Sequence, residues 1–194
     1  MPRLPASSVR VRFHEMDDYS FASEVALHLL SVEFGVTLDG ILCDPAIAES
    51  FDKLADCYSP TRHTPREYRW AALTLRKRAK DAKRLAPRFE QWLTSRLPKA
   101  QPLAQLVPSQ QNVPGVYTLV SRDQRELYVG ETYDLGKKLE QIRGTAAWME
   151  LRPESVRIFA GQGRGLSGLK SVLIQRVNPR LNSFLLFPRL EPTG

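Results

Sequence analysis

Tyrosines and basic side chains are the residues of this sequence whose types and spacing could do chemistry. Two short segments, Gly115-Val116-Tyr117 and Tyr128-Val129-Gly130, place two tyrosines eleven residues apart in strand-like stretches. Lys138 follows the second segment closely. Lysine ammonium groups attract phosphate oxygens. The pattern is compatible with a site for a phosphate-bearing partner, and also with a hairpin whose tyrosines serve packing.

The two tyrosine segments resemble the paired signature of the GIY-YIG nuclease superfamily. The resemblance continues into the next helix and ends on a leucine-isoleucine, proline and asparagine pattern. The residues that carry it beyond the paired segments are Thr132, Leu135, Lys138, Leu173, Ile174, Pro179, Arg180, Leu181 and Asn182. It covers about residues 113–185, and the spacing of the segments together with the distant closing pattern makes it specific.

The resemblance implies a compact three-stranded sheet flanked by helices, which cuts DNA phosphodiesters with one divalent metal. Such hydrolysis needs an aligned, deprotonated water, a Lewis acid on a phosphate oxygen, and a cation for the transition state. In the family the signature tyrosines orient or deprotonate the water, and Tyr117 and Tyr128 match them by position. Asn182 matches the closing asparagine.

Two positions depart from the family pattern, and both carry lysine. The arginine that stabilises the phosphate is replaced by Lys138, which keeps the charge and loses the planar fork. The metal-holding glutamate is replaced by Lys170, which repels a dication. We therefore expect no metal at this position and no metal-dependent cleavage. Lys170→Glu is the change expected to move the protein towards activity, and Lys138→Arg should help further.

Two alternatives for this site stay open. Glu131, Asp134 and Glu140 could supply relocated metal ligands, although we expect them on the helix after the hairpin rather than on the helix of Lys170. Alternatively, Tyr117 and Tyr128 only pack the hairpin, with their hydroxyls facing solvent.

The charge of the chain is unevenly distributed. The formal total is +7, but residues 1–61 carry −6, residues 62–105 carry +9 and residues 106–194 carry +4. A basic block attracts phosphate-bearing partners, with an affinity that falls steeply in salt because counterions are released. It could equally be a solvated helix face that pairs with the acidic N-terminal segment.

The N-terminal part is predicted to be helical. Apolar spacing and the flanking Gly35 predict a helix over residues 20–34, and an Asp-Pro start predicts another over residues 44–59. A capping box opens a long basic helix over residues 64–86. We expect Trp70 on that helix to belong to the core. Alternatively, the helix, with Arg69 and Trp70 adjacent, could lie along a duplex backbone or enter a groove.

A short further helix is expected within residues 87–97, followed by a Pro/Gln-rich linker at 106–113. We place a domain boundary near residue 105, between a helical domain (1–105) and a GIY-YIG-like domain (114–194). The second domain is predicted to contain strands at 116–120, 126–130 and 156–160 and helices at 133–142 and 166–177. The fold class is α+β, with a three-stranded, mainly antiparallel sheet flanked by helices.

Several function classes are disfavoured by the sequence. No apolar run approaches the roughly 18 to 20 residues that cross a bilayer, so we expect a cytoplasmic protein without a membrane partner. Cys43 and Cys57 lack the paired spacing of a zinc site and are expected to be buried small apolar residues. The glycine-rich loop at 161–165 lacks a P-loop Lys-Ser or Lys-Thr pair and is interpreted as a flexible turn.

The leading hypothesis is a double-stranded DNA-binding protein built on a nuclease-like domain that has lost metal-dependent cleavage and needs no cofactor. One alternative is an active Mg²⁺-dependent endonuclease with relocated ligands, and another is an adaptor that docks a protein partner. The candidate site residues are Tyr117, Tyr128, Lys138, Asn182 and Lys170. The candidate DNA-binding residues are Arg66, Arg69, Arg76, Lys77, Lys80, Lys83, Arg84, Lys137, Arg143, Arg176 and Arg180.

Overall fold

The computed structural model describes residues 13–90, 97–105, 112–161 and 165–182, with side chains described from residue 19 onwards. The helices in these ranges are α1 (Phe13–Phe34), α2 (Leu38–Cys43), α3 (Pro45–Tyr58), α4 (Pro65–Leu85), α5 (Pro87–Glu90), α6 (Leu135–Gly144), α7 (Ala146–Glu150) and α8 (Leu166–Val177), with a 3₁₀ turn at Leu103–Gln105. The strands are β1 (Gln101–Pro102), β2 (Gly115–Ser121), β3 (Glu126–Thr132) and β4 (Pro153–Ala160). The α+β class is confirmed.

The three predicted N-terminal helices are present because their end signals act locally. The Asp44 carboxylate accepts hydrogen bonds from two backbone N–H groups at the start of α3. Thr64 and Glu67 form the expected capping box of α4, with Thr64 N donating to Glu67 Oε2 at 2.7 Å. Gly35 ends α1 at φ +64°, a left-handed conformation that glycine adopts without steric penalty. The six-residue helix α2 was not predicted.

The sheet has four antiparallel strands among the described residues, in the order β1-β4-β2-β3, where three were predicted. The three long strands are those expected from the sequence. The fourth, β1, has only two residues, and Gln101 pairs with Val156 of β4. Such a short edge strand containing a proline gives no alternating pattern to detect. The helix expected at 133–142 is α6, displaced by two residues at each end, and α7 was not predicted.

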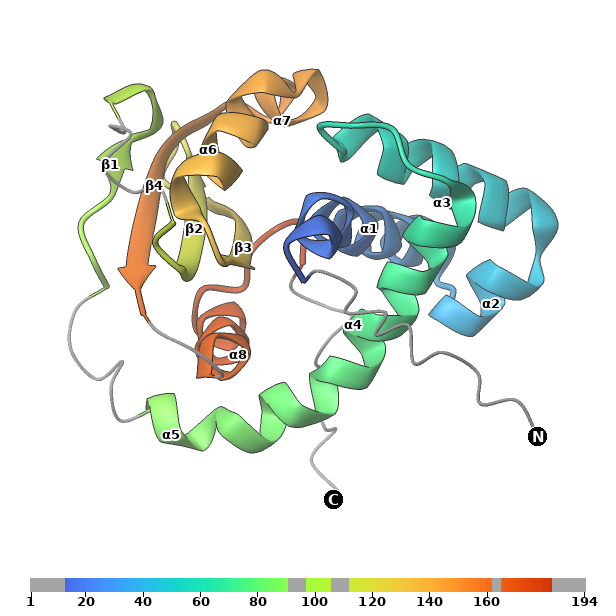
Figure 1. Ribbon diagram of the computed structural model, residues 1–194, viewed down its shortest axis with the longest axis horizontal. Coiled ribbons are helices and arrows are strands. Elements are labelled where there is room, and N and C mark those ends of the chain that lie inside the picture. Colours follow the sequence, from blue (N-terminus) through green and yellow to red (C-terminus); the bar gives the residue numbers. More distant parts are fainter. Residues whose placement is uncertain (1–12, 91–96, 106–111, 162–164, 183–194) are drawn as a thin grey trace, which may run out of the picture.

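The sheet is covered on both faces. Val116 and Val129 belong to an apolar cluster with residues of α8. Tyr117 and Tyr128 point to the other face and belong to a cluster with residues of α1, α6 and α7. In Figure 1, helix α8 lies at the lower end of the β2-β3 hairpin, and α6 and α7 lie towards its upper end.

Helix α1 lies at the centre of the molecule, between the sheet and the helices α3 and α4 (Figure 1). Phe21 and Val25 pack in the cluster that contains the sheet tyrosines. Ala26 and Leu30, on the opposite side of the helix, pack in a second cluster with α3 and α4. Packing therefore crosses the boundary expected near residue 105.

Two local expectations were wrong, and three fall partly outside the described residues. Trp70 is 55% exposed and does not belong to the core. Cys43 and Cys57 are exposed free thiols and are not buried. The helix expected within 87–97 is described only as α5, and the rest of that range lies largely outside the described residues, as do most of the linker at 106–113 and residues 162–164 of the glycine-rich loop.

No helix among the described residues is both long and apolar enough to cross a membrane.

Candidate functional site

The two signature tyrosines lie on neighbouring strands and on the same face of the sheet. Tyr117 is opposite Gly130, and Tyr128 is opposite Leu119, so the two side chains are diagonal neighbours. Their ring centroids are 6.1 Å apart, and both residues are fully buried. A Cβ at Gly130 would lie 2.3 Å from the Tyr117 ring, so the glycine lets this ring lie across β3.

The Glu24 carboxylate of α1 is the centre of a buried polar cluster in front of these tyrosines. Tyr128 donates its hydroxyl hydrogen bond to Glu24 Oε2 at 2.6 Å. The Lys170 ammonium of α8 contacts the same oxygen at 2.6 Å. Glu24 is 4% exposed and Lys170 is 6% exposed, so this is a buried ion pair. A carboxylate from α1 therefore neutralises Lys170, the lysine that the sequence pattern placed where the GIY-YIG nucleases have a glutamate.

Asn182 connects this cluster to the edge of the sheet. Its amide nitrogen donates to the Val129 carbonyl at 2.6 Å, and its amide oxygen accepts from the Val129 N–H at 3.2 Å. The same amide nitrogen lies 3.3 Å from Glu24 Oε1. The neighbouring Leu181 N–H donates to the Leu127 carbonyl at 2.9 Å. The closing segment thus pairs with the outer edge of β3 and holds Asn182 against Glu24.

Lys138 of α6 is also covered by α1. Its side chain is 1% exposed, and its Nζ lies 4.1 Å from the centroid of the Phe21 ring. Phe21 in turn stacks on Trp148 of α7, with ring centroids 5.6 Å apart. The Trp148 indole N–H donates to the Tyr58 carbonyl at the end of α3. Helices α1, α3 and α7 therefore meet over the face that carries the tyrosines.

The structure gathers the five sequence-predicted site residues around one buried region. Phe21 and Glu24 of α1 lie directly against these residues, and the Tyr128 hydroxyl donates a hydrogen bond inside the protein rather than facing solvent. In a buried ion pair the two charges compensate each other. Removing one partner leaves the other charge buried without a counter-charge, which lowers the free energy of unfolding by about 3–5 kcal/mol. As folded, the cluster can position hydrogen bonds, but Lys138 and Lys170 are too buried to serve as a DNA surface.

The acidic residues considered as relocated ligands have other roles. Asp134 caps α6, where its carboxylate accepts from the Lys137 N–H at 3.0 Å. Glu131 does not lie on the helix after the hairpin, as expected, but in β3. It lines a cavity of about 20 Å³ between α4 and α8, together with Lys170 and Ser171. Glu140 is exposed on α6. Among the residues described, no three His, Cys, Asp or Glu side chains gather as metal ligands would.

A buried histidine adjoins the cluster. His28 lies one turn after Glu24 on α1, is 4% exposed, and its Nε2 donates to the Arg180 carbonyl at 2.7 Å. Burial lowers the pKa of His28, and the Arg180 carbonyl and the Glu24 charge oppose this shift only in part. The neutral imidazole is therefore favoured in the folded protein.

A second candidate site is the outer face of α4, which is basic along its length. The helix has 21 residues and is about 31 Å long. Its exposed residues include Arg66, Trp70, Arg76, Lys77, Lys80, Lys83 and Arg84. We call this surface the α4 face.

Part of the positive charge of α4 is paired with acidic residues nearer the N-terminus. Arg69 makes a two-point contact with Asp52 of α3, at 3.1 and 2.5 Å. Arg76 contacts Asp39 of α2 at 2.6 Å. Before the helix, Arg62 lies 3.9 Å from Asp56 of α3. The expectation that this block pairs with the acidic segment is therefore met for three arginines, and Arg69 in particular holds α4 to α3.

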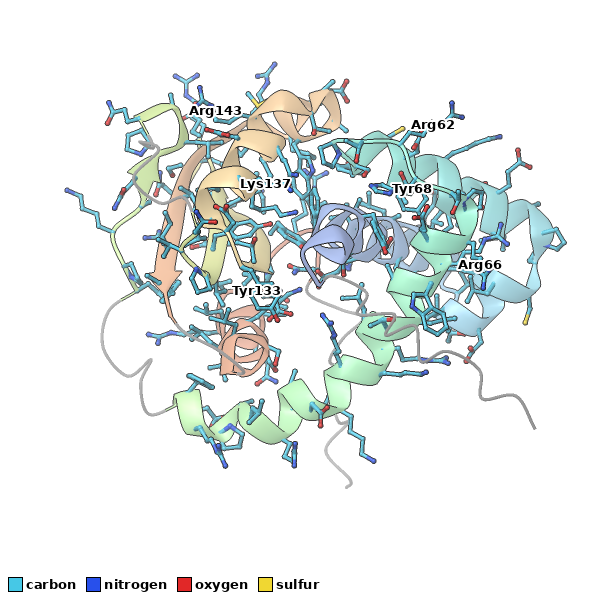
Figure 2. The ribbon with its side chains drawn as sticks, in the orientation of Figure 1. Arg62, Arg66, Tyr68, Tyr133, Lys137 and Arg143 are labelled. Atoms are coloured by element: carbon cyan, nitrogen blue, oxygen red, sulfur yellow. The ribbon has the colours of Figure 1, made fainter. Side chains whose placement is uncertain are left out.

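The other predicted DNA-binding residues lie elsewhere on the surface. Lys137 and Arg143 are exposed on α6, and Arg176 and Arg180 are exposed at and after the end of α8. In Figure 2, Lys137 and Arg143 lie on the half of the molecule that contains the sheet, whereas Arg66 lies on the opposite half. Lys137 and Arg143 therefore do not form one patch with Arg66 of the α4 face.

Glu24 was not among the site residues predicted from the sequence. The signal was present, because Glu24 is the one acidic or basic residue, histidine aside, between Tyr19 and Val32. A lone carboxylate within an apolar helical run requires a buried partner. The sequence could not show that this partner is Lys170, which lies 146 positions later.

Comparisons of the chain with protein-family models, with curated proteins and with solved structures gave no match. The function is therefore inferred from the geometry of the chain itself.

Proposed function

We propose that this protein binds double-stranded DNA through the α4 face and does not cleave it. The observation that carries the proposal is the exposed row of cations on one rigid helix. Arg66, Lys77 and Lys80 stand on the solvent side of α4, and the helix packs against α1 and α8 on its other side. A basic helix about 31 Å long matches roughly one turn of duplex DNA, so its cations can follow the phosphate backbone.

The buried cluster supports the second half of the proposal. Cleavage of a phosphodiester needs the reacting phosphate to reach the catalytic groups. Tyr117 and Tyr128 are fully buried behind α1, and Lys170 is bound to Glu24. The GIY-YIG-like part, in this proposal, is a scaffold that α1 joins to the DNA-binding helix.

Fluorescence anisotropy with a labelled duplex, titrated from about 50 to 200 mM salt, tests the binding. Contacts with several phosphates predict that the affinity falls by orders of magnitude over this range, since each contact releases counterions. No binding at low salt, or tight binding that ignores salt, would refute the proposal and favour the adaptor alternative. A plasmid-nicking assay with Mg²⁺ or Mn²⁺ tests the absence of cleavage. Metal-dependent nicking that Tyr117→Phe abolishes would support the endonuclease alternative instead.

A further inference from the structure

The α4 face carries an aromatic side chain among its cations. Trp70 is 55% exposed, and the Nζ of Lys77 lies 5.6 Å from the centroid of its ring. Arg66 stands one turn before Trp70 on the same side of the helix. Burying an indole stabilises a protein strongly, yet this one is held at the surface between two basic residues. Its exposure suggests a ligand that uses the ring.

Intact duplex DNA offers phosphates to the cations of this face but no unstacked base to the Trp70 indole. Its phosphates are accessible, whereas its bases remain stacked inside the helix. An unpaired base offers a free π-face, and stacking on an aromatic side chain contributes about 1–3 kcal/mol per base. A cation beside the ring suits the phosphates that flank such a base.

We infer that the α4 face also binds single-stranded DNA, with Trp70 stacking on an unpaired base and with Arg66 and Lys77 contacting the phosphates on its two sides. The inference rests on the proposed function, because the same cations hold the backbone of either form of DNA. The rise from Arg66 to Lys77 is about 16 Å along the helix, which leaves room for a stacked base between the two cations.

The test compares a labelled single-stranded oligonucleotide with the blunt duplex of the same sequence, both at low salt. Trp70→Ala should raise the Kd for the single strand about tenfold or more and change the duplex Kd by less than about twofold. Trp70→Phe should keep most of the single-strand affinity because it retains a ring. Phe34→Ala removes an aromatic residue of similar exposure, 52%, from α1 and should change neither affinity.

Intrinsic fluorescence supplies a direct signature of stacking. Single-stranded DNA should quench the tryptophan emission of the unmodified protein, and Trp70→Phe should remove that quench while the protein still binds. A structural role of Trp70 would not produce this difference.

The outcomes separate the inference from the proposed function. If neither form of DNA binds, the proposed function fails and the inference fails with it. If the duplex binds but the single strand does not, or if Trp70→Ala weakens both forms equally or neither, the proposed function stands and the stacking inference is overturned.

Discussion

Glu24 balances the charge of the buried cluster. One of its carboxylate oxygens accepts a hydrogen bond from the Tyr128 hydroxyl and contacts the Lys170 ammonium. Its other oxygen faces the Asn182 amide at 3.3 Å. Three residues, from β3, α8 and the closing segment, thus depend on this one carboxylate of α1. Replacing it must leave a buried ammonium group without its counter-charge.

We expect Glu24→Ala to lower the free energy of unfolding by about 3–5 kcal/mol, since it leaves Lys170 charged and buried. The double variant Glu24→Met/Lys170→Met should recover much of this loss, because an apolar pair of similar volume needs no counter-charge. Urea unfolding measures both. Lys53→Ala breaks the exposed pair with Glu49 and should cost less than about 1 kcal/mol. A Glu24→Ala loss no greater than that of this control would contradict the role given to Glu24.

His28 should make stability depend on pH. Burial lowers its folded-state pKa below the usual value of 6.5, so the unfolded chain binds the proton more readily. The free energy of unfolding should therefore fall as the pH drops through about 6.5 towards the folded-state pKa, by at most about 1.4 kcal/mol per pH unit. Above that window, both states are neutral and His28 adds no pH dependence.

The variant His28→Gln isolates this effect, because a glutamine amide can donate to the Arg180 carbonyl and does not titrate. The stability advantage of the unmodified protein over His28→Gln should shrink between pH 7.5 and 5.5, a range that brackets the usual pKa of about 6.5. An advantage that stays constant over this range would show that the folded-state pKa of His28 is not lowered.

At the scale of elements, α1 changes what is expected of Lys170→Glu. From the sequence alone, this substitution should attract a metal ion and move the protein towards cleavage. In the structure it would place a second carboxylate against Glu24, in a site that is 4–6% exposed. Two buried like charges in contact repel each other by several kcal/mol.

We therefore expect Lys170→Glu to destabilise the protein and to produce no nicking of plasmid DNA with Mg²⁺. The exchanged pair Glu24→Lys/Lys170→Glu should recover most of the stability in urea, because opposite charges face each other again. A single variant that is as stable as the parent and cuts DNA would show that α1 does not close this site.

The elements that the sequence predicted are those whose signals are local. The capping residues Asp44 and Thr64 and the helix-ending Gly35 all act within a few residues of their own positions. The elements that were missed are short: α2, α7 and β1 have six, five and two residues. Segments of this length do not complete a periodic pattern.

At the scale of the whole molecule, the sequence identified the polar positions of the candidate site but not what covers them. Tyr117, Tyr128 and Asn182 were found from the resemblance to the GIY-YIG pattern. The placement of α1 against the sheet depends on packing between residues more than ninety positions apart, such as Phe21 and Trp148. Trp70 was assigned to the core from its residue type, and the structure shows that its helix turns it outwards. Tertiary packing decides both outcomes.

In the proposed function, DNA binds the α4 face and not the half of the molecule that carries α6. Arg66 and Arg143 lie on opposite halves of the molecule (Figure 2), so a change in one patch should leave the other intact. The two patches can therefore be compared directly with matched substitutions that remove charge and keep a polar side chain.

The most direct test is the slope of log affinity against log salt for duplex DNA. Arg66→Gln/Lys77→Gln/Lys80→Gln on α4 should reduce the magnitude of the slope by about 2 to 3, since each lost phosphate contact removes about 0.9. The matched control Lys137→Gln/Arg143→Gln on α6 should leave the slope within about 0.5 of the parent value. A slope that is unchanged by the α4 substitutions, or reduced instead by the α6 substitutions, would contradict the assignment of DNA binding to the α4 face.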